Sequence, residues 1–292
     1  MKDQNSTTPD FLPFGGHDFQ SPPTEAPIHI LPVCYEHKVS YGTGTKIAPL
    51  YLLEASEQLE QMDDETMTNW GELKFHTRQP FFPSNDPNKS VDEIKAAAFE
   101  SIEAGKFLLS FGGDHSVSIG LIKAAAEKYP DIGVIQIDAH SDLRDSWNGS
   151  KNNHACIMRR VVSDMKLKTV QVGIRSFSPE EVVFMKEQGL KPFFAYEIDG
   201  RLDWIEEAIE ELPEFVYLTI DVDGLDPSIM PGTGTPEPGG LTYRQLTKLI
   251  SELGKKRKVI AADITELSKI SGSQVSEFTA AKIATKIMIH CP

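Results

Sequence analysis

The stretch Ile132-Gly-Val-Ile-Gln-Ile137 is largely apolar and of strand length, and it runs directly into Asp138-Ala-His-Ser-Asp142. Side chains alternate between the two faces of a strand, so we expect Asp138, His140 and Asp142 to point the same way. The segment therefore predicts a buried strand that delivers three oxygen or imidazole ligands at its end.

Two further segments repeat this arrangement. Val216-Tyr-Leu-Thr-Ile220 precedes Asp221-Val-Asp223, and Phe107-Leu-Leu-Ser-Phe111 precedes Gly112-Gly-Asp-His-Ser116. Any one of them alone is typical of an ordinary turn at a strand end, where Asp, Gly and Ser are common. Three strand-like runs that each end in a potential ligand make a shared site the stronger interpretation.

These segments together predict a metal centre. Its candidate ligands are His115, Asp138, His140, Asp142, Asp221 and Asp223. Such groups would repel one another and lose hydration unless a cation neutralised them. Four aspartates and two histidines are too many for one tetrahedral zinc ion, but they suit two adjacent ions of intermediate hardness, with manganese as the first choice.

The rest of the chain alternates strand-like and helix-like segments. We expect strands near 29–34, 107–111, 132–137, 169–172, 192–195, 216–220 and 259–264, and helices near 50–61, 91–104, 116–128, 156–164, 179–188, 202–212, 241–253 and 276–289. This alternation favours a parallel sheet with helices on both faces and ligands outside the carboxyl ends of the strands. Residues 1–27 are rich in proline, glycine and polar residues and predict an extended segment, and residues 28–292 predict a single α/β domain.

Composition narrows the classes of function. The 292 residues carry a net charge of −14, which disfavours nucleic acid and anionic membranes as partners. No run approaches ~20 apolar residues, and the first residues lack the apolar core of a secretory signal, so we expect a cytoplasmic protein. The three cysteines are widely spaced, which argues against both a disulfide framework and a cysteine-based zinc site.

Three motifs resemble the signatures of the arginase and agmatinase family of ureohydrolases. They are GGDHS at 112–116, DAHSD at 138–142 and TIDVDGLDPSIMPGTGTPEPGGL at 219–241. The resemblance implies a three-layer α/β/α fold with an eight-stranded parallel sheet, two Mn²⁺ ions per subunit and a homotrimer or homohexamer. It also implies hydrolysis of a guanidinium group to urea and an amine.

The resemblance also implies roles for single residues. The six candidate ligands fall on the family's metal-binding positions, His154 falls on its active-site histidine, and Glu266 falls on the carboxylate that binds the guanidinium. A guanidinium carbon is a poor electrophile, so two cations would have to lower the pKa of a water molecule to supply a nucleophile. Glu266 could hold the planar cation through paired hydrogen bonds, and His154, titrating near neutrality, could pass a proton to the departing amine. The sequence departs from the family pattern after Glu266, where Leu267 and Ser268 replace the usual asparagine and proline.

The substrate is the least determined feature. The stretch 143–153 lacks the asparagine and serine arrangement with which arginases hold an amino acid, and His154-Ala-Cys-Ile-Met-Arg-Arg160 resembles the agmatinase branch. We therefore expect cleavage of agmatine to putrescine and urea, a step of polyamine biosynthesis. N1-aminopropylagmatine, which would give spermidine, is the next candidate, and guanidino acids are more distant.

Two other classes of function stay open. One is a non-catalytic scaffold with the same fold, and the other is a dinuclear phosphoester hydrolase, for which the chain lacks a cluster of cationic residues.

Overall fold

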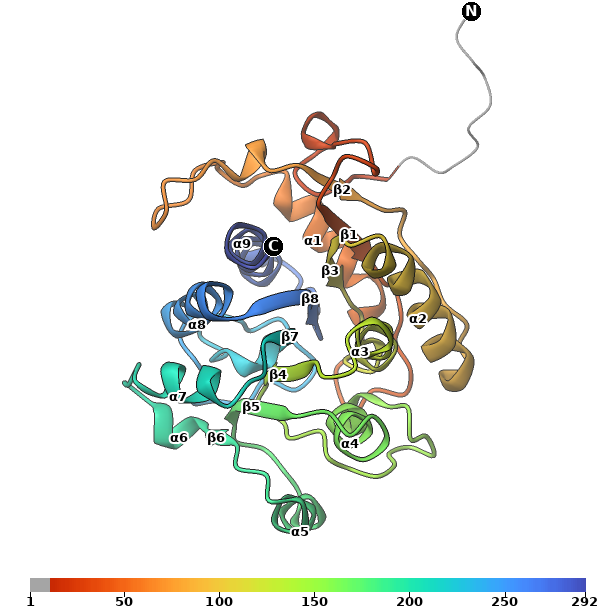
Figure 1. The fold of residues 1–292 in the computed structure, drawn as a ribbon, viewed down its shortest axis with the longest axis vertical. Helices are drawn as coiled ribbons and strands as arrows, with labels where there is room; N and C mark the ends of the chain where they lie inside the picture. Colours follow the sequence, from red (N-terminus) through yellow and green to blue (C-terminus); the bar gives the residue numbers. More distant parts are fainter. Residues whose placement is uncertain (1–10) are drawn as a thin grey trace, which may run out of the picture.

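Eight parallel strands form one sheet at the centre of residues 11–292, the part of the chain that the computed structural model describes (Figure 1). The strands lie in the order β2-β1-β3-β8-β7-β4-β5-β6. Their bounds are β1 Ile28–Pro32, β2 Phe75–Thr77, β3 Phe107–Phe111, β4 Gly133–Ile137, β5 Thr169–Ile174, β6 Phe193–Phe194, β7 Phe215–Asp221 and β8 Lys258–Thr265. Because all are parallel, their carboxyl ends meet at one edge of the sheet.

Helices cover both faces of the sheet. Their bounds are α1 Ala48–Ser56, α2 Pro87–Glu103, α3 Val117–Lys128, α4 Ile157–Arg159, α5 Pro179–Gln188, α6 Ala195–Ile198, α7 Trp204–Glu210, α8 Tyr243–Lys256 and α9 Val275–His290. In Figure 1, α7, α8 and α9 lie on one side of the strands and α2 and α3 lie on the other. A π-helical turn, Arg160–Asp164, continues α4 without a break.

Two hydrophobic cores explain why these strands are apolar along their length. Leu108 of β3 packs into the core under α2 and α3, and its neighbour Leu109 packs into the core under α1, α8 and α9. The central strands are thus buried on both faces, as a parallel sheet between two helical layers requires. The helix ends follow from local chemistry, since the side chain of Asp86 accepts hydrogen bonds from Asn88 N and Lys89 N at the start of α2.

This architecture confirms the predicted three-layer α/β/α fold with an eight-stranded parallel sheet. Two local predictions were wrong. The helix predicted over 50–61 ends at Ser56, whose hydroxyl donates to Leu53 O and accepts from Gly15 N instead of continuing the helix. Strand β2 was not predicted, because its three residues are too few for a periodic pattern and it depends on pairing with β1.

The predicted N-terminal segment is only partly described. Residues 1–10 lie outside the described residues. Within 11–27, Phe14 is buried in the core under α1, α8 and α9. It packs against Trp70 and Phe75, whose ring centroids lie 5.7 and 6.0 Å from its own. The boundary between a segment at 1–27 and a domain at 28–292 stays a prediction.

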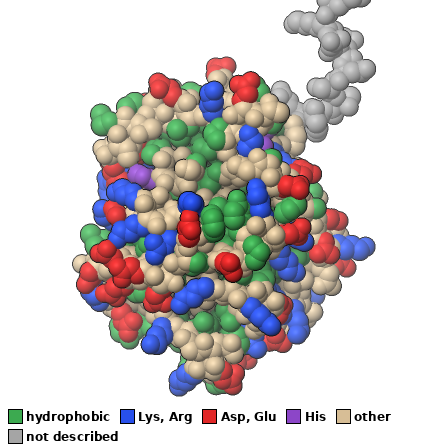
Figure 2. Space-filling view, in the orientation of Figure 1, with side chains coloured by type: hydrophobic (Ala, Val, Ile, Leu, Met, Phe, Trp, Pro, Cys, Tyr) green, Lys and Arg blue, Asp and Glu red, His purple; other side chains and the backbone are tan. Residues whose placement is uncertain are grey.

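The surface carries charges of both signs. Figure 2 shows Lys and Arg side chains interspersed with Asp and Glu side chains on the face that it draws. Within residues 11–292, no helix combines the length and the hydropathy needed to cross a bilayer.

Candidate active site

The four central strands bring the predicted site residues to one edge of the sheet. His115 follows β3, the stretch 138–142 follows β4, and Glu266 follows β8. Asp221 is the last residue of β7, and Asp223 lies in the turn after it.

The predicted alternation of side chains along one strand is not what gathers the ligands after β4. That strand ends at Ile137, and the turn beyond it, in which Asp142 has a φ of 52°, directs its side chain inward. A non-glycine residue in this left-handed region costs about 1–3 kcal/mol, which the surrounding contacts must offset.

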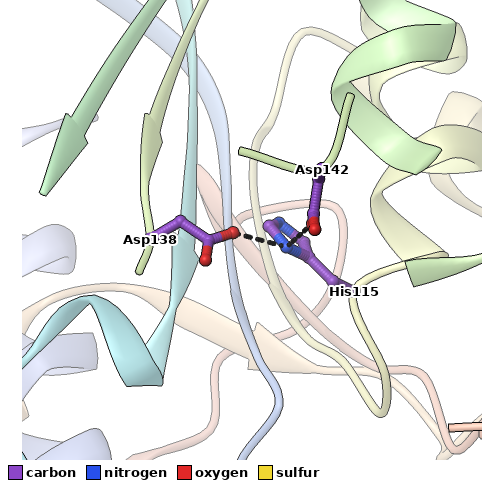
Figure 3. Close-up of side chains that lie close together, drawn as sticks. All are labelled: His115, Asp138 and Asp142. Atoms are coloured by element: carbon purple, nitrogen blue, oxygen red, sulfur yellow. Dashed lines mark ion pairs between the residues drawn. The ribbon is translucent and has the colours of Figure 1, made fainter. Parts of the chain in front are cut away.

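One group of ligands forms around the ring of His115 (Figure 3). Its Nδ1 atom lies 3.1 Å from Asp138 Oδ2 and 3.1 Å from Asp142 Oδ2, and both carboxylates point at the ring. Asp221 Oδ2 is 3.5 Å from the same nitrogen. Three carboxylate oxygens and one imidazole nitrogen thus converge on a buried point.

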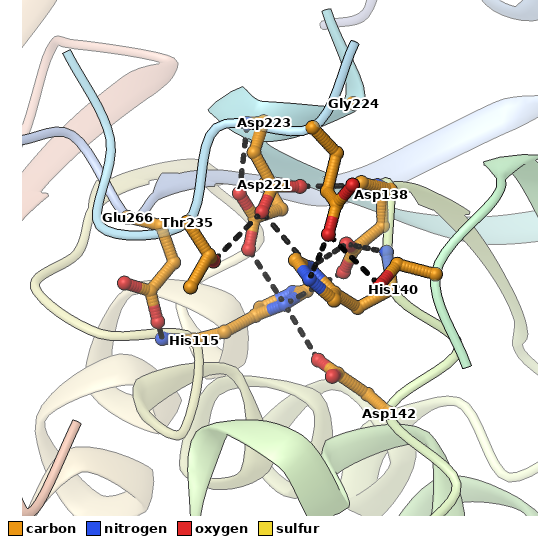
Figure 4. A network of polar contacts seen from close by, with 12 residues as sticks. His115, Asp138, His140, Asp142, Asp221, Asp223, Gly224, Thr235 and Glu266 are labelled. Carbon is orange, nitrogen blue, oxygen red and sulfur yellow. Dashed lines mark hydrogen bonds and ion pairs between the residues drawn. The ribbon is translucent and has the colours of Figure 1, made fainter. Parts of the chain in front are cut away.

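A second group shares one of these residues (Figure 4). His140 Nδ1 lies 2.9 Å from Asp223 Oδ2 and 3.6 Å from Asp138 Oδ1. Asp138 therefore presents one oxygen to His115 and the other to His140. The two sets of atoms that could each hold a metal ion are His115, Asp138 and Asp142, and Asp138, His140 and Asp223. A carboxylate that faces two such sets could contribute a ligand atom to each of them.

The hydrogen bonds behind His115 fix which of its ring nitrogens is available. Thr219 Oγ1 donates to Asp263 Oδ1 at 2.7 Å, so it can accept a hydrogen bond from His115 Nε2, which is 2.8 Å away. In the neutral ring this leaves Nδ1 without a proton. Within the described residues that atom is buried and makes no hydrogen bond, although carboxylates surround it. A deprotonated nitrogen among carboxylate oxygens fits a metal ion better than any protein group.

The charges of the cluster also indicate that the site suits a metal ion. Burial disfavours the charged form of His115, but the carboxylates of Asp138 and Asp142 outweigh it and raise the pKa of His115 well above its ordinary value. Burial and then the nearby Asp138 carboxylate raise the pKa of Asp142 to about 7. Burial and then Asp223 raise the pKa of Asp221 in the same direction. The carboxylates cannot all ionise together without a compensating cation, and a bound metal would provide it.

Glu266 lies beside the ligands with its backbone in a left-handed conformation, at a φ of 61°. Its Oε1 atom accepts a hydrogen bond of 2.7 Å from His115 N, and its own N–H donates to Gly113 O at 2.8 Å. Gly113 has no Cβ, which lets the backbone of Tyr35 pass close to it; a Cβ there would lie only 1.6 Å from Tyr35 O. Burial, and then the charge of Asp114, raise the pKa of Glu266 well above its ordinary value. A cationic ligand beside this carboxylate would stabilise its ionised form.

His154 begins the short helical segment His154–Cys156 and lines the same cavity. Its Nε2 atom lies 2.8 Å from Ser40 Oγ, and its Nδ1 atom is buried without a hydrogen-bond partner among the described residues. The prediction that His154 titrates near neutrality was wrong for this environment. Burial, followed by the charges of His115 and His140, lowers the pKa of His154 to about 4, so the ring is neutral at pH 7.

The cavity that joins these groups has a volume of about 250 Å³. Five of the six candidate ligands, all but the fully buried Asp138, form its floor together with Glu266, and its wall and mouth come from four loops. The mouth includes Ser40, Tyr41, Arg144, Trp147, Ser176, Phe177 and Thr235. The site residues predicted from three separate motifs therefore share one cavity with two further loops.

Comparisons with known proteins decide what kind of protein has this arrangement. A profile of the arginase family matches residues 26–290. The chain belongs to the arginase family. An N(1)-aminopropylagmatine ureohydrolase from Synechocystis sp. is 39% identical over 272 residues, which cover 90% of this chain and 89% of that protein. An agmatinase from Bacillus anthracis is 33% identical over 259 residues, which cover 86% of this chain and 87% of that protein.

Solved structures agree with this assignment. The crystal structure of agmatine ureohydrolase from Thermoplasma volcanium has a TM-score of 0.84 and 27% identity to this chain, with 96% of this chain and 94% of that chain covered. The chain is thus an arginase-family ureohydrolase, an enzyme of a family with a binuclear manganese centre. The His and Asp groups described above are able to hold metal.

Several residues of this arginase-family site were not singled out from the sequence. Asp263 orients His115 through Thr219, and its signal was a carboxylate in the middle of an otherwise apolar strand. Glu181 is buried and accepts hydrogen bonds from Ser141 Oγ and Leu143 N, so it holds the turn on which Asp142 lies. Neither Glu181 nor Ser40 lies in a motif that marks it.

Proposed function

We propose that this chain hydrolyses the guanidinium group of a small cationic guanidino compound to urea and an amine, with agmatine as the substrate and putrescine as the amine. The observation that carries the proposal is that the buried Asp138 belongs to both groups of potential metal ligands, and that other members of these groups line a cavity together with Glu266 and His154. A phosphoester substrate would instead need cationic groups around its anionic oxygens.

The proposed cofactors are two Mn²⁺ ions held by His115, Asp138, His140, Asp142, Asp221 and Asp223. Carboxylate and imidazole ligands without thiolates suit manganese. When bound, the ions would lower the pKa of a water molecule and so supply the nucleophile. The chain's own residues have the remaining tasks, which are to hold the substrate and to manage protons.

Glu266 is the proposed guanidinium-binding residue. Its carboxylate can accept paired N–H bonds from the planar cation, because each oxygen has two acceptor positions and His115 N occupies only one of them. This contact would hold the guanidinium carbon over the metal-ligand cluster and align it for attack.

His154 is the proposed proton carrier. Hydrolysis consumes one water molecule and breaks the bond between the guanidinium carbon and the nitrogen of the chain, and that nitrogen must take up a proton to leave as an amine. Ser40 occupies Nε2 of His154, which leaves Nδ1 to exchange the proton with the reacting groups.

N1-aminopropylagmatine is a second candidate substrate, with spermidine as the amine. The observation in its favour is that the relative named for this substrate is 39% identical to the chain, against 33% for the agmatinase. Both compounds carry a guanidinium at one end and positive charge along the rest of the chain. A homotrimer or homohexamer in the cytoplasm stays a prediction.

The test is urea release by the Mn²⁺-loaded protein on agmatine, N1-aminopropylagmatine, arginine and 4-guanidinobutyrate. We expect the highest kcat/KM with agmatine, and a higher value with its aminopropyl derivative would replace the first candidate by the second. Asp138→Asn should lose bound manganese, as measured by elemental analysis, together with turnover. Wild-type protein that binds two manganese ions and releases no urea from any of the four compounds would refute the proposed activity in favour of a scaffold.

A further inference from the structure

Four glutamates lie on or beside the loops that line the cavity, and three of them already have contacts within the protein. Glu36 Oε2 accepts hydrogen bonds from Gly44 N and from Thr45, and Glu181 accepts those of Ser141 and Leu143. Glu180 forms an ion pair of 2.6 Å with Arg144. Each of these three carboxylates therefore already has a contact within the protein, and the charge of Glu180 is balanced by a cation.

Glu237 is the exception. Its Oε1 atom accepts a hydrogen bond of 3.0 Å from Ser176 Oγ, and the nearest ring nitrogen is His140 Nε2 at 4.0 Å. Among residues 11–292, no lysine or arginine forms an ion pair with its carboxylate. The guanidinium of Arg175 is close, but it donates to the backbone carbonyl of Glu237 rather than to the side chain. The side chain is 37% exposed, so its charge is accessible beside the cavity.

The loop that carries Glu237 is held rigidly. Arg175 donates to the carbonyl oxygens of Glu237 at 2.6 Å and of Pro238 at 3.1 Å. Asp226 Oδ2 accepts a hydrogen bond of 2.8 Å from Gly239 N on the same loop. These contacts fix the backbone of Glu237 before any ligand arrives, which lowers the entropic cost of using its carboxylate.

The one arginine at the mouth does not offer a competing site for an anionic tail. Arg144 lies over the ring of Trp147, with its guanidinium carbon 4.4 Å from the ring centroid, and it is paired with Glu180. Glu180 thus already balances the charge of Arg144. Neither Arg144 nor Arg175 forms an ion pair with the carboxylate of Glu237.

We infer that Glu237 binds the charged nitrogen in the tail of the substrate and thereby selects guanidino compounds with a cationic tail over those with a neutral or anionic one. The inference rests on the proposed function and assigns a specificity residue to it. Glu266 would hold the guanidinium end, and Glu237 would hold the other charge at the mouth.

The experiment compares Glu237→Gln with wild type on two substrates that differ only at the tail. Agmatine carries a terminal ammonium, and 1-butylguanidine has the same guanidinium and four-carbon chain without it. Glutamine keeps the size of the side chain and can still accept the hydrogen bond of Ser176, so only the charge is lost. We expect kcat/KM for agmatine to fall about tenfold or more, mainly through KM, while the value for 1-butylguanidine stays within about twofold.

Glu197→Gln is the matched control, because it removes one negative charge from an exposed carboxylate whose contact is with Tyr196 rather than with the cavity. It should leave the ratio of the two substrates unchanged. Equal losses on both substrates with Glu237→Gln, or no loss on either, would overturn the assignment of Glu237 while leaving the proposed activity intact. Wild-type protein that releases urea from neither compound would instead overturn the proposed activity, and the tail-binding role with it.

Discussion

Ser40 Oγ lies 2.8 Å from His154 Nε2, although the two residues are 114 positions apart in the chain. Trp147 Nε1 donates to the same hydroxyl at 3.2 Å. An indole nitrogen can only donate, so Ser40 accepts from Trp147 and its own proton is free to point at His154. The loop at the cavity mouth thus sets the orientation and the tautomer of the proposed proton carrier.

Ser40→Ala should therefore lower kcat about fivefold and leave KM and manganese content nearly unchanged, because one hydrogen bond that orients His154 is lost. His154→Ala should cost more, about 10²-fold or greater in kcat, since it removes the proton carrier itself. Steady-state kinetics and elemental analysis measure both effects.

Ser40→Thr is the control, because it keeps the hydroxyl and should retain most of the activity. In a His154→Ala background, Ser40→Ala should have little further effect, as expected when one residue acts through the other. Full additivity of the two changes would mean that Ser40 acts independently of His154.

Thr219 connects Asp263 to His115, and its replacement tests the orientation of a metal ligand. Thr219→Val should weaken manganese binding by about 10–100-fold, because His115 Nε2 loses its acceptor and Asp263 loses a donor. Thr219→Ser keeps the hydroxyl and should bind manganese nearly as well as wild type. Calorimetric titration of metal-free protein with Mn²⁺ distinguishes the two, and equal affinities in wild type and Thr219→Val would show that the hydroxyl does not matter for His115.

These orienting contacts mark what the sequence could and could not predict. The ligands and the strands before them are local patterns, and the alternation of strands and helices predicts the parallel sheet whose carboxyl ends carry them, although it does not predict the order of the strands. Ser40, Asp263 and Glu237 contribute through partners 114, 44 and 61 residues away, so no local spacing marks them. The low pKa of His154 likewise depends on burial, which only the folded chain defines.

Glu266→Gln tests the proposed contact with the guanidinium. Glutamine can keep the hydrogen bond from His115 N through its carbonyl oxygen, so the loop and the metal ligands should be unaffected. It cannot offer two anionic acceptors to a planar cation, and we expect kcat/KM to fall about 100-fold. An unchanged kcat/KM at normal manganese content would mean that another group orients the substrate.

A buried ion cluster lies outside the active-site cavity. Lys286 of α9 is 1% exposed, and its Nζ atom lies 2.5 Å from Asp63 Oδ2 and 3.2 Å from Glu65 Oε2. Burial disfavours the charged form of Asp63, but the hydrogen bonds from Lys286 and Thr66 outweigh it and lower the pKa of Asp63 from 3.8 to about 2. The cluster joins the loop after α1 to the last helix of the chain.

Asp63→Asn should therefore lower the free energy of unfolding by about 2–3 kcal/mol near neutral pH, which corresponds to the lowering of the pKa of Asp63 from 3.8 to about 2. Glu65 and Asp64 remain as partners of Lys286 in this variant. The folded state lowers the pKa of Asp63, so its contribution is fully present above pH 3.8 and is lost as the pH falls through 2. Urea unfolding at several pH values should thus show a difference between wild type and Asp63→Asn that is constant above about pH 4 and shrinks toward pH 2. Asp64→Asn, at an exposed position of the same cluster, should change stability much less. A difference that persists undiminished at pH 2 would show that the ionisation of Asp63 is not the source of the effect.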